Sequence, residues 1–131
     1  DRLARKFETA KTLVPKPEVQ MKGKGGIGLI AWGTTHWAIV ESRDQLANEQ
    51  KLDTSYLRLR AYPFTQEVWD FIDACDRVYV VEQNRDAQML SLLKMECTTE
   101  QFAKLRSIRH YVGLPIDGRS VTTELLKQEG R

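Results

Sequence analysis

The chain has 131 residues, of which 41% are hydrophobic and 29% charged, and its formal net charge is +2. This length fits one domain, and the composition is that of a globular protein rather than a disordered one. The net charge is too small to indicate a nucleic acid or an anionic membrane as partner. The longest apolar runs, such as residues 27–32, are too short to span a bilayer, and no secretory signal opens the chain. We therefore expect a cytoplasmic protein.

The chain begins inside a helical pattern without an initial Met, which favours a fragment of a longer polypeptide. Cys75 and Cys97 are the only cysteines, and each falls on an apolar helical stripe, so both are expected to pack as small hydrophobic residues. Two cysteines are too few to ligate a standard iron–sulfur cluster or to form a Cys-rich zinc site. The chain is therefore expected to hold no such cluster by itself, and no metal site or bound cofactor is assigned to it.

Apolar spacing and turn residues predict six helices and five strands. The clearest helical pattern has Val68, Phe71, Ile72 and Cys75 on one stripe. Helices are expected over about the first dozen residues, from 35 to about 49, from 65 to about 75, over 87–97, from Thr98 over a short span, and over 120–129. Strands are expected over 18–21, 27–32, 55–60, 77–81 and 106–111. In the helix over 87–97, the side chains expected to point inward are Met89, Leu92, Leu93 and Cys97.

Hydroxyl side chains stand at several expected helix starts. Thr34 or Thr35 can cap one helix and Thr65 the next, while Thr98 and Gln101 have the spacing of a capping box.

One expected strand has a polar face. Arg58 and Arg60 alternate with Leu57 and Leu59, which a fully covered central strand would not show. An edge position is the simplest explanation, and a contact with another subunit is the alternative.

Strands that alternate with helices predict a largely parallel sheet with helices on both faces. The ligand crevice of such α/β sheets lies at the carboxyl ends of the strands, where the strand order reverses. Two polar turns follow the most apolar strands and are the candidate walls of that crevice. They contain Gly33, Thr34, Thr35 and His36 in the first turn and Glu82, Gln83, Asn84, Arg85 and Asp86 in the second.

These two turns allow either ligand binding or a purely structural role. The first can hold a phosphate or carboxylate through its amides and hydroxyls, or it can merely cap a helix beside a surface His36. In the second, Arg85 can grip an anion and Glu82 can act as an acid or base, or the turn is a self-satisfied salt-bridge loop at a protein interface.

Two further features are interpreted as structural. Residues 23–28 match the dinucleotide pattern G-x-G-x-x-G, but they precede a strand instead of opening a helix, so we infer a surface turn and no nucleotide. His110 lies before a loop fixed by Gly and Pro, and a lone His of this kind is more often structural than functional.

Four longer strings resemble one known family. They are residues 31–42 (AWGTTHWAIVES), 59–64 (LRAYPF), 78–89 (VYVVEQNRDAQM), and 107–111 (SIRHY) with 113–118 (GLPIDG). Together they resemble the carboxy-terminal part of the alpha subunit of 2-oxoacid:ferredoxin oxidoreductases, especially the 2-oxoglutarate type. The resemblance runs from about Arg5 to Leu126, and its most specific string is VEQNRD.

The resemblance implies a transketolase C-terminal-like domain. This fold is α/β, a three-layer α/β/α sandwich around a five-stranded mixed sheet of order 1-3-2-4-5 with strand 1 antiparallel. Without the resemblance, the first two strands would have been paired as a hairpin. Family members decarboxylate a 2-oxoacid oxidatively, transfer the acyl group to coenzyme A and pass electrons through iron–sulfur clusters to ferredoxin. Their thiamine diphosphate and magnesium lie mainly between other domains of the alpha and beta subunits.

We therefore expect residues 1–131 to be a single accessory domain within a longer alpha subunit, with the rest of that subunit and a beta subunit as partners. The two crevice turns are carried over as candidate contacts, and no residue is assigned as catalytic. A free-standing binding module for a phosphate or carboxylate is the alternative. A stand-alone enzyme using Glu82 with His36 or His110 is the least favoured hypothesis, because no residue spacing brings such groups together.

Overall fold

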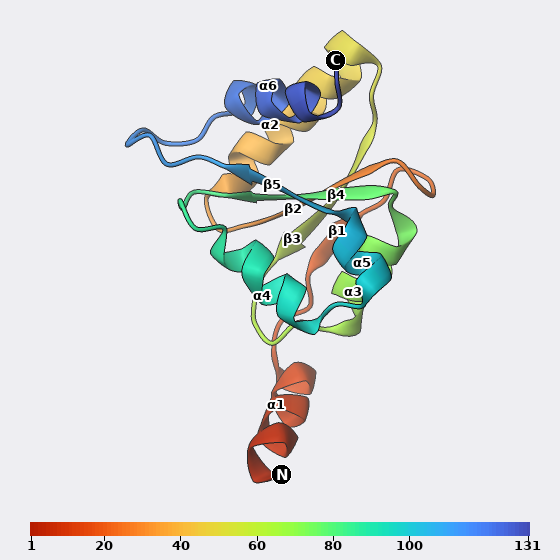
Figure 1. Ribbon diagram of the computed structural model, residues 1–131, viewed down its shortest axis with the longest axis vertical. Helices are drawn as coiled ribbons and strands as arrows, with labels where there is room; N and C mark the ends of the chain where they lie inside the picture. Colours follow the sequence, from red (N-terminus) through yellow and green to blue (C-terminus); the bar gives the residue numbers. More distant parts are fainter.

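The computed structural model describes residues 1–131 and contains six helices and five strands (Figure 1). The helices are α1 Arg2–Leu13, α2 Thr35–Gln50, α3 Gln66–Ala74, α4 Gln88–Glu96, α5 Thr99–Lys104 and α6 Gly118–Gln128. The strands are β1 Glu18–Gln20, β2 Ile27–Trp32, β3 Thr54–Leu59, β4 Arg77–Glu82 and β5 Leu105–Arg109. Every predicted helix and strand is present, with ends that shift by one or two residues. None of the helices has both the length and the apolar character that crossing a bilayer requires.

The strands form one mixed sheet in the order β1-β3-β2-β4-β5. Strand β1 is antiparallel to β3, and all other neighbouring strands are parallel. From β2 the chain first adds β3 on one side and then β4 on the other, so the strand order reverses between β2 and β4. The order implied by the family resemblance is confirmed, and β1 and β2 do not form a hairpin.

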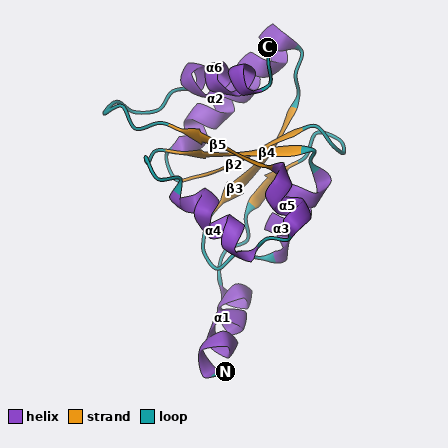
Figure 2. Cartoon of the chain, in the orientation of Figure 1, coloured by secondary structure: helices purple, strands orange, loops and turns teal.

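Helices cover both faces of the sheet and give three layers (Figures 1 and 2). Helices α2 and α6 lie together on one face, where Ile39, Leu46 and Leu125 are fully buried against the sheet. Helices α3, α4 and α5 lie on the opposite face, where Phe71 and Leu93 are buried. The sheet therefore separates two apolar clusters, as the parallel βαβ connections require.

Close packing of α3 on β2 depends on the absence of a side chain at Gly28. A Cβ atom at this position would lie 2.7 Å from the Cys75 Sγ atom and 2.9 Å from the Phe71 ring. The last glycine of the G-x-G-x-x-G string therefore serves helix–strand contact.

Strand β3 is not an edge strand, so the edge position inferred from Arg58 and Arg60 was wrong. It lies between β1 and β2, and Arg58 forms an ion pair with Glu18 across the β1–β3 ladder, at 3.8 Å. Strand β1 has only three residues, and all of them are exposed. The Arg58 side chain of β3, which faces β1, is therefore partly open to solvent. Arg60 lies beyond the end of the strand and is exposed.

Two details of the helices also differ from expectation. In α4 the buried side chains are Leu90 and Leu93, whereas Leu92 is 37% exposed. Cys75 is buried as expected, but Cys97 is only partly buried, and both thiols are free. The inward face of α4 thus centres on Leu90 and Leu93, and the predicted Met89 and Cys97 pack against the same core while only partly buried.

The predicted capping hydrogen bonds are confirmed in one case of three. Thr98 and Gln101 form the predicted capping box at the start of α5. Thr34 and Thr65 occupy the N-cap positions of α2 and α3 as predicted, but neither side chain makes the expected capping hydrogen bond.

Helix α1 projects away from the three layers (Figure 1). It contains no buried residue, and Leu3 and Phe7 on its apolar stripe are 61% and 45% exposed. The chain itself therefore leaves this apolar stripe largely uncovered. An isolated helix of this length is only marginally stable in water.

Candidate functional site

The two polar turns predicted to form a crevice lie side by side at the carboxyl ends of β2 and β4. Pairing between β2 and β4 stops at Ile30 and Val80, and both strands continue beyond that pair. The Gln83 Nε2 atom donates a hydrogen bond of 3.0 Å to the Thr35 Oγ1 atom and joins the two turns across the gap. This is the place where the strand order reverses, at which open α/β sheets bind their ligands.

Glu82 is fully buried, and its carboxylate is occupied by donors from the protein itself. Its Oε1 atom accepts from the Met89 backbone N–H and from Asn84 Nδ2, each at 2.8 Å, and its Oε2 atom accepts from the Leu90 N–H at 3.0 Å. The two backbone donors belong to the first turn of α4, where no intrahelical acceptor is available. Glu82 therefore caps α4 from the end of β4.

Asn84 completes this cap. Its Oδ1 atom accepts a hydrogen bond of 3.1 Å from the Gln88 N–H, the first residue of α4. The residue at the N-cap position, Ala87, has no side chain that can cap and is held in the left-handed region with φ of 51°. Glu82 and Asn84 thus replace a conventional N-cap residue, which favours a structural role over acid–base chemistry for Glu82.

Arg85 and Asp86 form an exposed ion pair, with 3.0 Å between Arg85 Nε and Asp86 Oδ1. The backbone oxygen of Arg85 also accepts from Arg109 Nη1 at 2.6 Å, which ties the turn to the end of β5. This geometry matches the salt-bridge loop considered as the alternative to ligand binding.

His36 is partly buried and packs on Tyr56. The two rings are stacked with centroids 5.7 Å apart, and His36 Nδ1 lies 3.1 Å from the Tyr56 hydroxyl oxygen. Burial lowers the pKa of His36, the positive charge of Arg58 lowers it further, and Glu18 opposes them. Burial raises the pKa of Tyr56 to about 12, so both shifts favour the uncharged forms of the two rings.

Gly33 and Thr34 form the open part of the crevice. Gly33 has φ of +59°, which favours glycine, and no atom lies within 4 Å of the position of a Cβ atom there. Thr34 is exposed and its hydroxyl makes no capping bond, while Thr35 is buried against Gln83. Gly33 and Thr34 are both exposed and are therefore accessible to another molecule.

An apolar cleft that the sequence reasoning missed adjoins Gly33. It has a volume of about 390 Å³ and is lined by Trp32, Gly33, Leu59, Arg60, Ala61, Tyr62 and Met89. The missed signal was the position of Arg60 and Tyr62, since residues after a parallel strand line the carboxyl-end crevice. Arg60 was assigned to the polar face of the strand and was therefore left out of the crevice, although the strand order implied by the resemblance placed this strand beside β2.

The residues considered for a stand-alone enzyme, Glu82 with His36 or His110, are not joined by side-chain hydrogen bonds. His110 Nε2 lies 2.9 Å from the Leu114 backbone oxygen and holds the loop after β5, and His36 is bonded to Tyr56. Neither ring hydrogen-bonds to the Glu82 carboxylate, whose partners are Asn84 and the amides of α4.

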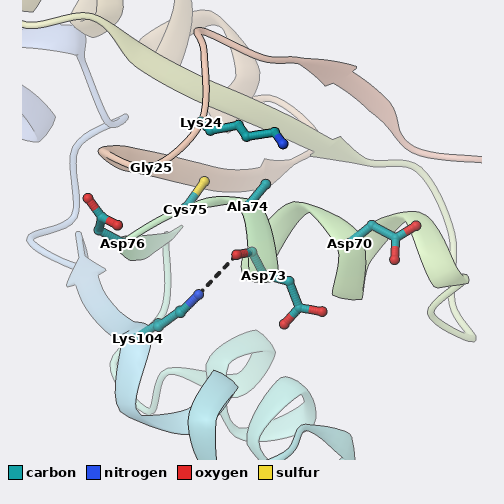
Figure 3. Close-up of a pocket in the computed structure, with 8 residues that line it drawn as sticks. All are labelled: Lys24, Gly25, Asp70, Asp73, Ala74, Cys75, Asp76 and Lys104. Atoms are coloured by element: carbon teal, nitrogen blue, oxygen red, sulfur yellow. Dashed lines mark hydrogen bonds between the residues drawn. The ribbon is translucent and has the colours of Figure 1, made fainter.

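A second cavity of about 510 Å³ lies at the opposite end of the sheet, beside the glycine-rich turn (Figure 3). The Gly26 N–H donates to Asp76 Oδ2 at 2.8 Å and the Gly25 N–H donates to the Ala74 oxygen, so these amides are occupied by the protein itself. The turn precedes β2 and opens no helix, which agrees with its interpretation as structural. Lys104 Nζ donates to the Asp73 backbone oxygen at 3.0 Å and fixes the end of α3 (Figure 3).

The residues present do not fit the metal groups of a redox enzyme. No three His, Cys, Asp or Glu side chains gather in a way that could hold a metal ion. Burial raises the pKa of the Cys75 thiol to about 11, which disfavours the thiolate that a metal ligand requires.

Comparison with known proteins identifies the fold. No protein-family profile matches the chain, and no curated protein matches it in sequence. A split-gene transketolase, described as an inactive β4 tetramer, superposes with a TM-score of 0.63 at 13% identity, over 86% of this chain and 40% of that chain. The chain has the transketolase C-terminal-like fold.

Two other structures with this transketolase C-terminal-like fold are 2-oxoacid:ferredoxin oxidoreductases. The enzyme from Magnetococcus marinus, solved with 2-oxoglutarate, coenzyme A and succinyl-CoA bound, superposes with a TM-score of 0.78 at 20% identity. That match covers 95% of this chain and 21% of that chain. The alpha chain of a probable 2-oxoacid ferredoxin oxidoreductase from Thermoplasma acidophilum gives 0.56 at 19% identity, over 88% of this chain and 98% of that chain. The structural neighbours are thus those that the sequence strings indicated.

Proposed function

We propose that residues 1–131 are one accessory domain of the alpha subunit of a cytoplasmic 2-oxoacid:ferredoxin oxidoreductase, of the 2-oxoglutarate type. The observation that carries this proposal is the superposition of 95% of the chain on 2-oxoglutarate:ferredoxin oxidoreductase with a TM-score of 0.78. The parent enzyme would decarboxylate its 2-oxoacid oxidatively, form the coenzyme A thioester and deliver electrons to ferredoxin.

The arrangement of polar groups supports an accessory role. The Glu82 carboxylate has three protein donors, Arg85 is paired with Asp86, and the His36 ring is engaged with Tyr56. These contacts stabilise the turns of the crevice and occupy the Glu82 carboxylate and one nitrogen of the His36 ring, which favours a structural role. Thiamine diphosphate with magnesium would supply the decarboxylation chemistry and the iron–sulfur cluster the electron transfer, each held by other domains.

The exposed surface supports a role in assembly. The apolar side chains of α1 are uncovered, and Trp37 at the start of α2 and Leu114 after β5 are 70% and 72% exposed. Uncovered apolar groups of this size favour a contact with another polypeptide. The rest of the alpha subunit and a beta subunit are the partners proposed for these surfaces.

The assembly role is tested with the purified chain and the purified remainder of the enzyme. The chain alone is expected to give no 2-oxoglutarate-dependent reduction of a viologen dye in the presence of coenzyme A, thiamine diphosphate and Mg²⁺. It is expected to co-elute with the thiamine-binding polypeptide in size-exclusion chromatography. Replacing Leu3 and Phe7 by Asp should abolish co-elution without changing the chain's own stability, whereas Met95→Asp, at an 80% exposed position on α4, serves as the control. Dye reduction by the chain alone would reject the accessory role.

A free-standing module that binds a phosphate or carboxylate is the second candidate, favoured by the open turn at Gly33 and Thr34. Calorimetric titration of the isolated chain with coenzyme A, thiamine diphosphate and 2-oxoglutarate separates the two candidates. Tight binding of any of them to the chain alone supports the module.

A further inference from the structure

The apolar cleft beside Gly33 has the features of a small-molecule site. Its floor is Trp32 and Leu59, which are paired across the β2–β3 ladder at the last position of both strands. Its sides are the loop through Arg60 and Tyr62 and the start of α4 at Met89. We propose that this cleft binds the apolar body of a small amphipathic carboxylate and that Arg60 pairs with its carboxylate group.

The walls of the cleft are fixed before any ligand binds. Leu59 is only 5% exposed, because it belongs to the core between the sheet and α3. The Tyr62 ring lies edge-on to Phe64, with centroids 5.0 Å apart and planes at 87°. The Tyr62 hydroxyl donates to Glu96 Oε2 at 3.3 Å. A preformed site loses little conformational entropy on binding, which favours binding of a small molecule.

Arg60 is the only charged residue that lines the cleft, and its guanidinium group makes no ion pair or hydrogen bond within the chain. The nearby Arg58, on β3, pairs with Glu18, and the carboxylate of Glu96 accepts a hydrogen bond from Tyr62. No ion pair within the chain neutralises the Arg60 guanidinium group, so an anion is the complementary ligand. The planar guanidinium group suits a carboxylate in particular.

The residues that line the cleft determine which apolar group of the ligand fits there. Trp32, Tyr62 and Met89 offer two aromatic rings and a thioether, which pack well against a flat apolar group. The cleft volume, about 390 Å³, lies near the lower end of the range of ligand pockets, roughly 300–1,000 Å³. A monocyclic aryl or branched alkyl carboxylate fits this chemistry better than a nucleotide-sized molecule.

The inference is tested by titrating the full chain with 3-phenylpropionate and following the indole signal of Trp32 by NMR, assigned through the Trp32→Phe variant. We expect a saturable shift with 3-phenylpropionate, binding at least about tenfold weaker with the neutral 3-phenylpropanamide, and no shift with acetate. The amide lacks the charge and acetate lacks the apolar body, so the two compounds separate the two parts of the site.

Variants identify the charged group. Arg60→Ala should weaken binding of 3-phenylpropionate by about tenfold or more, with the fold intact by circular dichroism. The matched control is Arg85→Ala, which removes an exposed arginine of the neighbouring turn and should leave the affinity unchanged. Equal affinity of the Arg60→Ala variant and the natural chain, or no saturable shift at all, overturns the inference. Either result leaves the assembly role untouched, because that role is measured by co-elution.

Discussion

Glu82 shows how a single side chain can determine whether a candidate site is chemical or structural. It lies at the end of a buried strand and next to a polar turn, a position typical of catalytic carboxylates in α/β folds. In the structure, its two oxygens receive two amides of α4 and the Asn84 side chain. A buried carboxylate with three donors is satisfied, and it compensates for the lack of a capping side chain at Ala87.

Replacing Glu82 by Gln should destabilise the protein by about 2–3 kcal/mol, because the amide group removes the charge and turns an N–H donor toward the donors of α4. The measurement is urea unfolding, with a lower midpoint and an unchanged slope expected. Asp53→Asn is the control, since Asp53 is exposed and accepts no side-chain hydrogen bond, and its effect should stay within about 0.5 kcal/mol. Equal stability of Glu82→Gln and the natural chain would show that the cap contributes nothing.

At the scale of elements, α6 is attached to the sheet by a polar contact as well as by its apolar face. Glu129, just after α6, accepts hydrogen bonds from Arg77 at the start of β4 and from the Tyr79 hydroxyl, the latter at 2.8 Å. The hydrogen bonds from Arg77 lower the pKa of the Glu129 carboxyl, burial opposes them, and the Tyr79 hydroxyl assists them.

This contact predicts a dependence of stability on pH. A carboxyl whose pKa is lower in the folded state stabilises the fold above its unfolded pKa, about 4.3, and loses that contribution as the pH falls through the folded pKa. Glu129→Gln should therefore be less stable than the natural chain by about 1–2 kcal/mol at pH 7. The difference should shrink toward zero as urea unfolding is repeated at acidic pH. A difference that is the same at neutral and acidic pH would assign the effect to packing alone.

At the scale of the whole molecule, stability and outward contacts belong to different parts of the chain. The two apolar clusters lie on either side of the sheet and involve residues from Ile27 to Leu125. Helix α1 contributes no buried residue to either cluster. The sheet with its five covering helices is thus complete without α1.

Removing residues 1–13 should leave a protein that unfolds cooperatively, with a free energy of unfolding within about 1 kcal/mol of the intact chain. Hydrogen exchange of the intact chain should correspondingly show fast exchange of the α1 amides and slow exchange of those in β2 and β4. Loss of cooperative unfolding in the shortened chain would mean that α1 is part of the stabilising core.

Apolar periodicity and turn residues determined the helices, the strands and their order along the chain, because these are local properties. Buried runs such as residues 27–32 and the Thr98–Gln101 capping box need no distant partner to be recognised. The strand order came from resemblance, since the alternation of elements alone did not exclude a β1–β2 hairpin. Tertiary structure alone decided what Glu82, Leu90 and Arg58 contact, because their partners are set by how α4 and β1 pack. For the same reason only the folded chain revealed the cleft at Arg60, whose walls come from segments distant in sequence.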